Sequence, residues 1–110
     1  MGVEPEATGR LLNESDLYLQ TRGEFVEARD AVERALTIDE KVDGKDHPQV
    51  AIYANNLGTV LQDLGDFEGA KKCHARALKI FQDKLGEGHP HTVKARNNLA
   101  ALEREMKGEG

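Results

Sequence analysis

The sequence repeats itself with a period of 42 residues, and this limits the folds that the chain can adopt. Residues 65–102 carry many of the same residue types as 23–60, and we call residues 42 apart counterparts. Self-similarity at a fixed period of this length indicates a repeat array, in which each unit stacks on the next to bury its apolar face. The identical pairs are Gly23/Gly65, Phe25/Phe67, Ala28/Ala70, Arg34/Arg76, Ala35/Ala77, Leu36/Leu78, Ile38/Ile80, Gly44/Gly86, His47/His89, Pro48/Pro90, Asn55/Asn97, Asn56/Asn98 and Leu57/Leu99.

The composition suits a repeat array, whose core is a thin seam between helices. Hydrophobic residues make up 38% of the chain and charged residues 32%, whereas ordinary globular chains are about half apolar. The net charge of −5 argues against general nucleic-acid binding, which needs a clustered basic face. No apolar run approaches the ~20 residues of a membrane span. Cys73 is the one cysteine, so no internal disulfide can form, and a reducing, cytoplasmic location is expected.

Apolar residues at spacings of three and four predict an all-α chain of five helices, with no segment that alternates like a strand. A first helix should end at Gly23, and the others should span about 24–42, 48–64, 66–85 and 90–106. Glycine just past a helix and proline at its first position are the usual boundary signals. The predicted buried residues are Phe25, Ala28, Val32, Ala35, Leu36 and Ile38, then Val50, Ala51, Ala54, Leu57, Gly58, Leu61 and Leu64, then Phe67, Ala70, Cys73, Ala77, Leu78 and Phe81, with Val93, Ala95, Leu99, Ala100 and Leu102 as the apolar residues of the last helix.

One stretch of the sequence resembles the tetratricopeptide repeat. Its matching residues are Leu57-Gly58, Leu61, the turn Gly65-Asp66-Phe67, Ala70 and Ala77-Leu78. The usual period of that repeat is about 34 residues. The longer period here, the link at 44–48 and Asn55-Asn56-Leu57 look like its kinesin light chain subclass. The resemblance covers about residues 8–106 and implies a right-handed α-solenoid of antiparallel helix pairs. A HEAT-type array has a similar period but does not explain the Gly-Asp-Phe turn.

The resemblance divides the chain into a lead-in (1–7), a repeat domain (8–107) and a tail (108–110). Within the domain, a first repeat spans about 8–46, a second about 47–88, and a capping half-repeat about 89–107. The first repeat departs from the pattern, because Ser15-Asp16 stand where Leu57-Gly58 would match. This indicates a divergent cap or a piece of a longer array.

Asparagine recurs at one place in each first helix of a pair, at Asn13, Asn55 and Asn97, beside Asn56 and Asn98. Asparagine is a mediocre helix former, so its recurrence needs a reason. In families of this kind the first helices line a concave groove, where an amide can bind the main chain of a peptide. The alternative is a ladder of amides between adjacent helices. One pair, Asn55/Asn97 or Asn56/Asn98, could serve each purpose.

The groove implied by the resemblance gathers further polar side chains. Three of its members are cationic, so a ligand with acidic groups or a terminal carboxylate would suit it, although Asp63 and Glu105 lie beside them. The predicted groove residues are Arg10, Asn13, Gln20, Asn55, Thr59, Gln62, Lys94, Asn97 and Arg104.

No catalytic or metal motif stands out, so neither a cofactor nor a metal is expected. The histidines His47 and His89 belong to two separate links, and zinc needs three or four convergent ligands. Cys73 should be a packed, inert thiol. We therefore expect a protein-interaction scaffold that binds a peptide of a partner protein, with no enzymatic activity. The alternative is a structural spacer or self-association segment. A monomer is expected, with end-to-end pairing of two copies as the other possibility.

Overall fold

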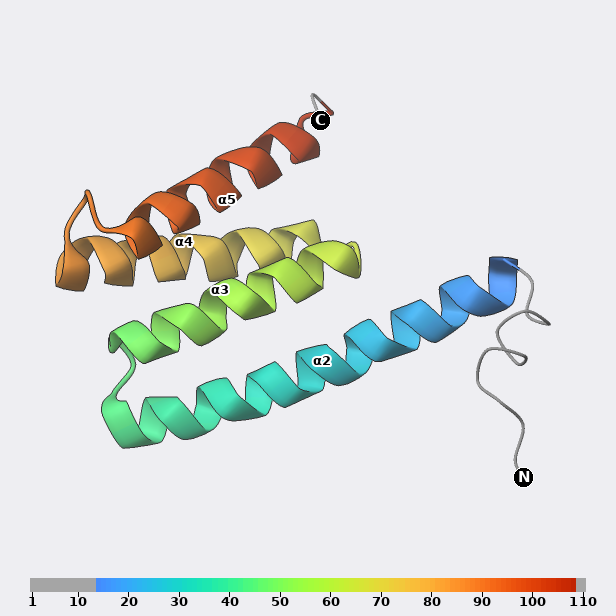
Figure 1. Cartoon of the computed structure of the whole chain (residues 1–110), viewed down its shortest axis with the longest axis horizontal. Coiled ribbons are helices and arrows are strands. Elements are labelled where there is room, and N and C mark those ends of the chain that lie inside the picture. The colour runs from blue at the N-terminus through green and yellow to red at the C-terminus, as the bar shows by residue number, and fades with distance from the viewer. Residues whose placement is uncertain (1–13, 109–110) are drawn as a thin grey trace.

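The computed structural model describes residues 14–108 of the chain, and every regular element in that range is helical. The helices are α2 (Glu14–Asp43), α3 (Pro48–Asp63), α4 (Phe67–Leu85) and α5 (Pro90–Met106). Each packs on its neighbour in the sequence, α2 on α3, α3 on α4 and α4 on α5, as Figure 1 shows. The predicted all-α fold is confirmed, and its last three helices lie close to their expected bounds.

The two His-Pro links start their helices in the same way. The Nδ1 atom of His47 accepts a hydrogen bond from the backbone N–H of Gln49 at 3.0 Å. His89 does the same with the N–H of His91, also at 3.0 Å. A proline follows each histidine at a position where its missing N–H costs nothing. The histidines are therefore helix caps, which explains their recurrence in the repeat.

The helix end predicted at Gly23 is wrong. α2 is one helix of 30 residues that passes through Gly23, so residues 14–108 hold four helices where the sequence predicted parts of five. The counterpart Gly65 has a φ of 89° and reverses the chain, and Asp66 caps α4 by accepting the N–H of Gly69 at 3.0 Å. Glu24 stands in the place of Asp66, and glutamate favours helix continuation over capping.

The core lies mainly between α3 and α4, where small side chains let the two helices approach closely. Ala51 and Ala77 are fully buried and Ala54 is almost so. Leu102 of α5 is also fully buried and closes a second cluster with Leu57. All the residues predicted for the buried face of α3 are buried: Val50, Ala51, Ala54, Leu57, Gly58, Leu61 and Leu64.

Several predicted core residues are more exposed than expected: Ile38 and Val93 are exposed, and the half-buried ones are Phe25, Ala28, Val32, Ala35, Leu36, Phe67, Cys73, Leu78, Leu99 and Ala100. Ile38 is 62% exposed, although its counterpart Ile80 is only 4% exposed. α3 covers Ile80, and no described residue packs over the matching face of α2. Val93 is 38% exposed because it lies on the outer side of the last helix. Leu78 is half-buried, at the edge of the core cluster.

No helix of the described range combines the length and the hydropathy that a membrane crossing requires.

Candidate functional site

One side of α3 and one side of α5 form a joint polar surface, which we call the α3–α5 surface. Residues three and four apart share a helix face, and two side-chain hydrogen bonds join the faces of the two helices. Gln62 Nε2 donates to Glu105 Oε1 at 2.8 Å, and Asn98 Nδ2 donates to Asn55 Oδ1 at 3.4 Å. The surface consists of Ile52, Asn55, Asn56, Thr59, Gln62 and Asp63 on α3 and Lys94, Asn97, Asn98, Ala101, Arg104 and Glu105 on α5.

Asn55 does not lie open on this surface, which corrects its predicted placement. Asn55 is only 8% exposed. Its Oδ1 atom accepts a hydrogen bond from His74 Nδ1 at 2.7 Å as well as the one from Asn98. Asn55 thus joins three helices, as in the amide ladder considered as the alternative. The ladder pairs Asn55 with Asn98, and neither of the two predicted pairs is the one that forms.

His74 is the polar residue at the centre of this joint, and it is 1% exposed. Because Asn55 Oδ1 is an acceptor, His74 Nδ1 carries the proton, and the buried Nε2 has no partner among the described residues. Burial lowers the pKa of His74 below its ordinary value of 6.5. The imidazole is therefore held neutral, with its ring against Gly58. A Cβ added at Gly58 would meet the ring at 2.8 Å, so glycine is needed at this contact.

The pairing of Asn55 with His74 escaped the sequence analysis. Two polar residues at facing core positions, 19 residues apart, were the available signal. Considered together, the two residues would have predicted Asn55 in the core and not on the open surface.

The open amides of the α3–α5 surface are Asn56 and Asn97, which are both exposed. Thr59 is exposed too, and its hydroxyl donates to the backbone carbonyl of Asn55 at 3.3 Å. Lys94 and Arg104 are exposed, and neither takes part in an ion pair within residues 22–108. Two amides, a hydroxyl and two free cations are therefore available for a ligand.

The remaining predicted groove residues add no open side chain to this surface among the residues that the structure describes. Arg10 and Asn13 lie outside the described residues. Gln20 lies in α2, but its side chain is outside the part that the structure describes. Gln62 is half-buried and holds Glu105, so it contributes to the joint between the helices more than to the open surface.

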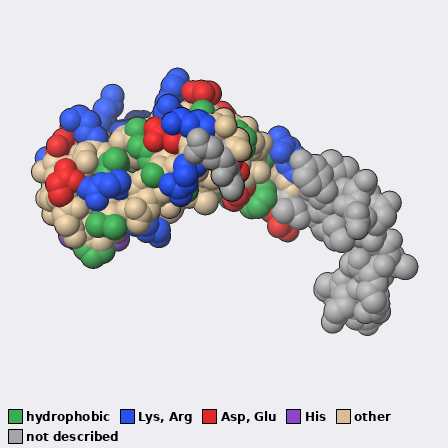
Figure 2. Space-filling model, turned by 90° about the horizontal axis from the view of Figure 1, so that it is seen from above, with side chains coloured by type: hydrophobic (Ala, Val, Ile, Leu, Met, Phe, Trp, Pro, Cys, Tyr) green, Lys and Arg blue, Asp and Glu red, His purple; other side chains and the backbone are tan. Residues whose placement is uncertain are grey.

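Charge on the visible side of the molecule is mixed. Figure 2 shows lysine and arginine side chains interspersed with aspartate and glutamate, with hydrophobic side chains between them. No single sign dominates that face. A charged group of a ligand would therefore be recognised by individual side chains, Lys94 and Arg104, and not by the overall charge of the face.

One group of side chains could hold a metal ion. The ligand atoms of Asp39, Asp43 and His47 lie within 4.8 Å of one another at the link between α2 and α3. Burial and the neighbouring Asp43 raise the pKa of Asp39. In the second repeat the counterparts are Phe81, which is 2% exposed, and Leu85. Asp39 and Asp43 thus stand where the second repeat has apolar side chains. The Nδ1 atom of His47 already accepts a hydrogen bond as a helix cap.

Cys73 is half-buried, and burial raises the pKa of its thiol above the ordinary value. A neutral thiol is a poor nucleophile and metal ligand. The geometry is therefore that of a packing residue, as the sequence indicated.

A search of curated proteins finds no match to the chain. The sequence model described as "Tetratricopeptide repeat" matches residues 9–71 and again 54–109. The two matches overlap and together span nearly the whole chain, and the helix pair α3–α4 with its Gly-Asp-Phe turn lies within them. The chain belongs to the tetratricopeptide repeat family.

Proposed function

We propose that the α3–α5 surface binds a peptide segment of a partner protein. Tetratricopeptide repeats are generally protein–protein interaction modules. The observation that carries the proposal is the presence of open amides, Asn56 and Asn97, on two helices that are locked together by internal hydrogen bonds. An amide supplies both a donor and an acceptor, which is what a peptide main chain requires.

The internal joint supports this function because it leaves little to be ordered when a ligand binds. Asn55 holds His74 and Asn98, and Gln62 holds Glu105. The spacing between the open amides of α3 and α5 is therefore set before the ligand arrives. Preorganisation of this kind lowers the entropic cost of association.

The free cations Lys94 and Arg104 favour a peptide with acidic side chains or a terminal carboxylate. Asp63 and Glu105 lie nearby, so the preference should be modest. Charge at such an exposed site acts more on association rate and specificity than on affinity.

Several finer features belong to the same proposal. The stacked helices would continue as a right-handed solenoid, with repeats bounded near residues 46 and 88, and the period of 42 residues would place the chain in the kinesin-light-chain-like subclass. The protein would act in the cytoplasm, without catalytic activity. A structural spacer is the competing function, and it would not need open amides on two adjacent helices.

The test is a screen of the chain against arrays of about ten-residue peptides of varied charge, followed by calorimetry with the best binder. Asn97→Ala should weaken binding about 5- to 150-fold, because an unsatisfied polar group costs about 1–3 kcal/mol. The melting temperature should stay unchanged, since the Asn97 side chain is exposed. Lys94→Ala should weaken acidic peptides more than neutral ones.

Lys72→Ala is the matched control, because Lys72 is an exposed lysine on α4, away from the α3–α5 surface. It should leave binding as it is. Equal losses for Lys72→Ala and Lys94→Ala, or no binder in the array, would count against the proposal. Asn55→Ala should mainly lower the melting temperature, because this residue holds the joint together.

A further inference from the structure

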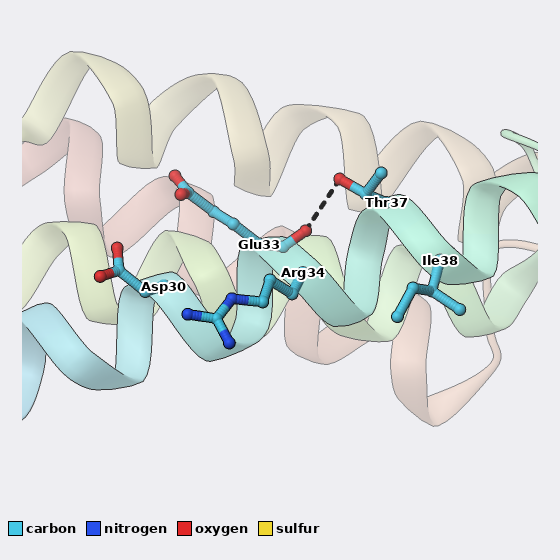
Figure 3. Close-up of a pocket in the computed structure, with 5 residues that line it drawn as sticks. All are labelled: Asp30, Glu33, Arg34, Thr37 and Ile38. Carbon is cyan, nitrogen blue, oxygen red and sulfur yellow. Dashed lines mark hydrogen bonds between the residues drawn. The ribbon is translucent and has the colours of Figure 1, made fainter.

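The outer face of α2 is open along the part of the chain that the structure describes. Ile38 is 62% exposed and Val42 73% exposed, and a shallow hollow lies beside them. Figure 3 shows the residues that line this hollow, Asp30, Glu33, Arg34, Thr37 and Ile38, on successive turns of the one helix. In the second repeat the matching face of α4 is covered by α3, which leaves Ile80 only 4% exposed.

The helical residues just before this face do not cover it. Residues 14–22 continue the axis of α2 through Gly23, and a straight helix cannot fold back on itself. Arg22 Nη1 donates to the backbone carbonyl of Leu64 at 3.2 Å, so the helix passes the end of α3 at this point and runs on beyond it (Figure 1). Asp16 is the counterpart of Gly58, the glycine whose lack of a Cβ lets α3 lie against the ring of His74 in the second repeat.

The open face is self-complementary when two copies of α2 run antiparallel. Val26, Asp30, Arg34 and Ile38 are each four residues apart, so they form one row along the helix. If a second α2 runs antiparallel, with its centre at residue 32, Val26 of each copy lies opposite Ile38 of the other. Asp30 of each copy then lies opposite Arg34 of the other. A two-fold axis repeats every such contact, which is the condition for a symmetric dimer.

The charges in this row are available for such a pairing. Arg34 is exposed and makes no ion pair within residues 22–108. The ion pair that Asp30 makes is with Arg29 of its own helix, with Nε at 3.4 Å, and both side chains are substantially exposed. Exposed pairs of this kind are weak, so Asp30 can turn to an arginine on another helix at little cost.

We propose that two copies of this chain associate through the outer faces of their α2 helices, antiparallel, with Asp30 of each copy paired to Arg34 of the other. The contact covers Ile38 in both copies with an apolar residue of the partner. Its area is that of one helix pair, and small interfaces of this kind are weak or transient. The dissociation constant should be on the order of tens of micromolar. The α3–α5 surface stays free in the dimer, so the inference does not depend on peptide binding.

Sedimentation equilibrium from about 5 to 300 µM tests the pairing. The unmodified chain should dimerise reversibly in this range. Arg34→Asp sets two carboxylates opposite each other at two places and should weaken dimerisation at least about tenfold. The double variant Asp30→Arg with Arg34→Asp restores opposite charges across the two-fold axis and should restore the dimer. Lys72→Asp makes the same change of charge on α4 and should have no effect.

Circular dichroism would verify that each variant keeps its helices. A dimer that survives Arg34→Asp, or one that the double variant does not restore, would overturn the antiparallel pairing. A chain that stays monomeric at 300 µM would overturn the proposal. If Ile38→Asp also lowered the melting temperature of that monomer strongly, residues 1–13 of the same copy would be the cover in place of a second copy.

Discussion

The junctions at Gly23 and Gly65 have the same position in the repeat and opposite structures. At Gly65 the chain reverses with a φ of 89°, Leu64 is buried before the turn and Asp66 caps the helix after it. At Gly23 the helix runs straight on, with exposed Arg22 before the glycine and Glu24 after it. The glycine permits a turn, and its neighbours decide whether a turn forms.

The same contrast extends to the faces that the two junctions leave behind. Where the chain turns, α3 packs on α4 and buries Ile80. Where it does not turn, α2 keeps an open face with Ile38 exposed. Closure also needs Gly58, which lets α3 approach the ring of His74. The second repeat, whose helices pack together, has the capping residue Asp66, the buried Leu64 and the small Gly58. The first repeat has Glu24, Arg22 and Asp16 in their places.

The largest expected difference between the two regions is at the isoleucine counterparts. Ile80→Ala should destabilise the fold by about 2–5 kcal/mol, as truncations of buried aliphatic side chains do. Ile38→Ala should change stability by less than about 0.5 kcal/mol, because its side chain is largely exposed. Urea denaturation of both variants, at a concentration below that of any self-association, makes the comparison. Similar losses would mean that the face of α2 is covered in the monomer.

These results also show how far the sequence could be taken. The period, the His-Pro links and the buried face of α3 followed from spacing alone, because regular elements and caps depend on nearby residues. The run of α2 through Gly23 did not, because the glycine alone predicted a turn, whereas Glu24 follows it in place of the capping residue Asp66. The peptide-binding groove stays a prediction, and the burial of Asn55 could not be predicted because it depends on His74, which the fold brings to it from another helix.

The next effect concerns the contact that closes the second repeat. Gly58→Ala should cost about 1–3 kcal/mol, because the added methyl meets the His74 ring in a packed interior. Adding His74→Ala should remove part of this cost, so that the two substitutions are non-additive. A double-mutant cycle by urea denaturation would measure the coupling. Strict additivity would show that the ring does not limit the approach of α3.

A smaller effect is the pH dependence that His74 brings to the second repeat, where the first repeat has Val32. The pKa of His74 is lowered in the fold because it is buried, so the unfolded chain binds the proton more readily. Stability should therefore fall as the pH drops below about 6.5, the ordinary value for histidine. Melting curves from pH 8 to 5 should show this decline, and His74→Val should reduce it. An unchanged pH profile in the variant would assign the dependence to other groups.

The most direct test of the contrast is to replace each glycine by alanine and compare the melting temperatures. Gly23→Ala should stabilise the chain by about 0.5–1 kcal/mol, because it removes a helix-interior glycine with open space around it. Gly65→Ala should destabilise it by about 1–2 kcal/mol, because alanine resists the left-handed conformation. Shifts of opposite sign would support a continuous α2. A loss of stability in both variants would show that the chain turns at Gly23 as it does at Gly65, which would contradict the account.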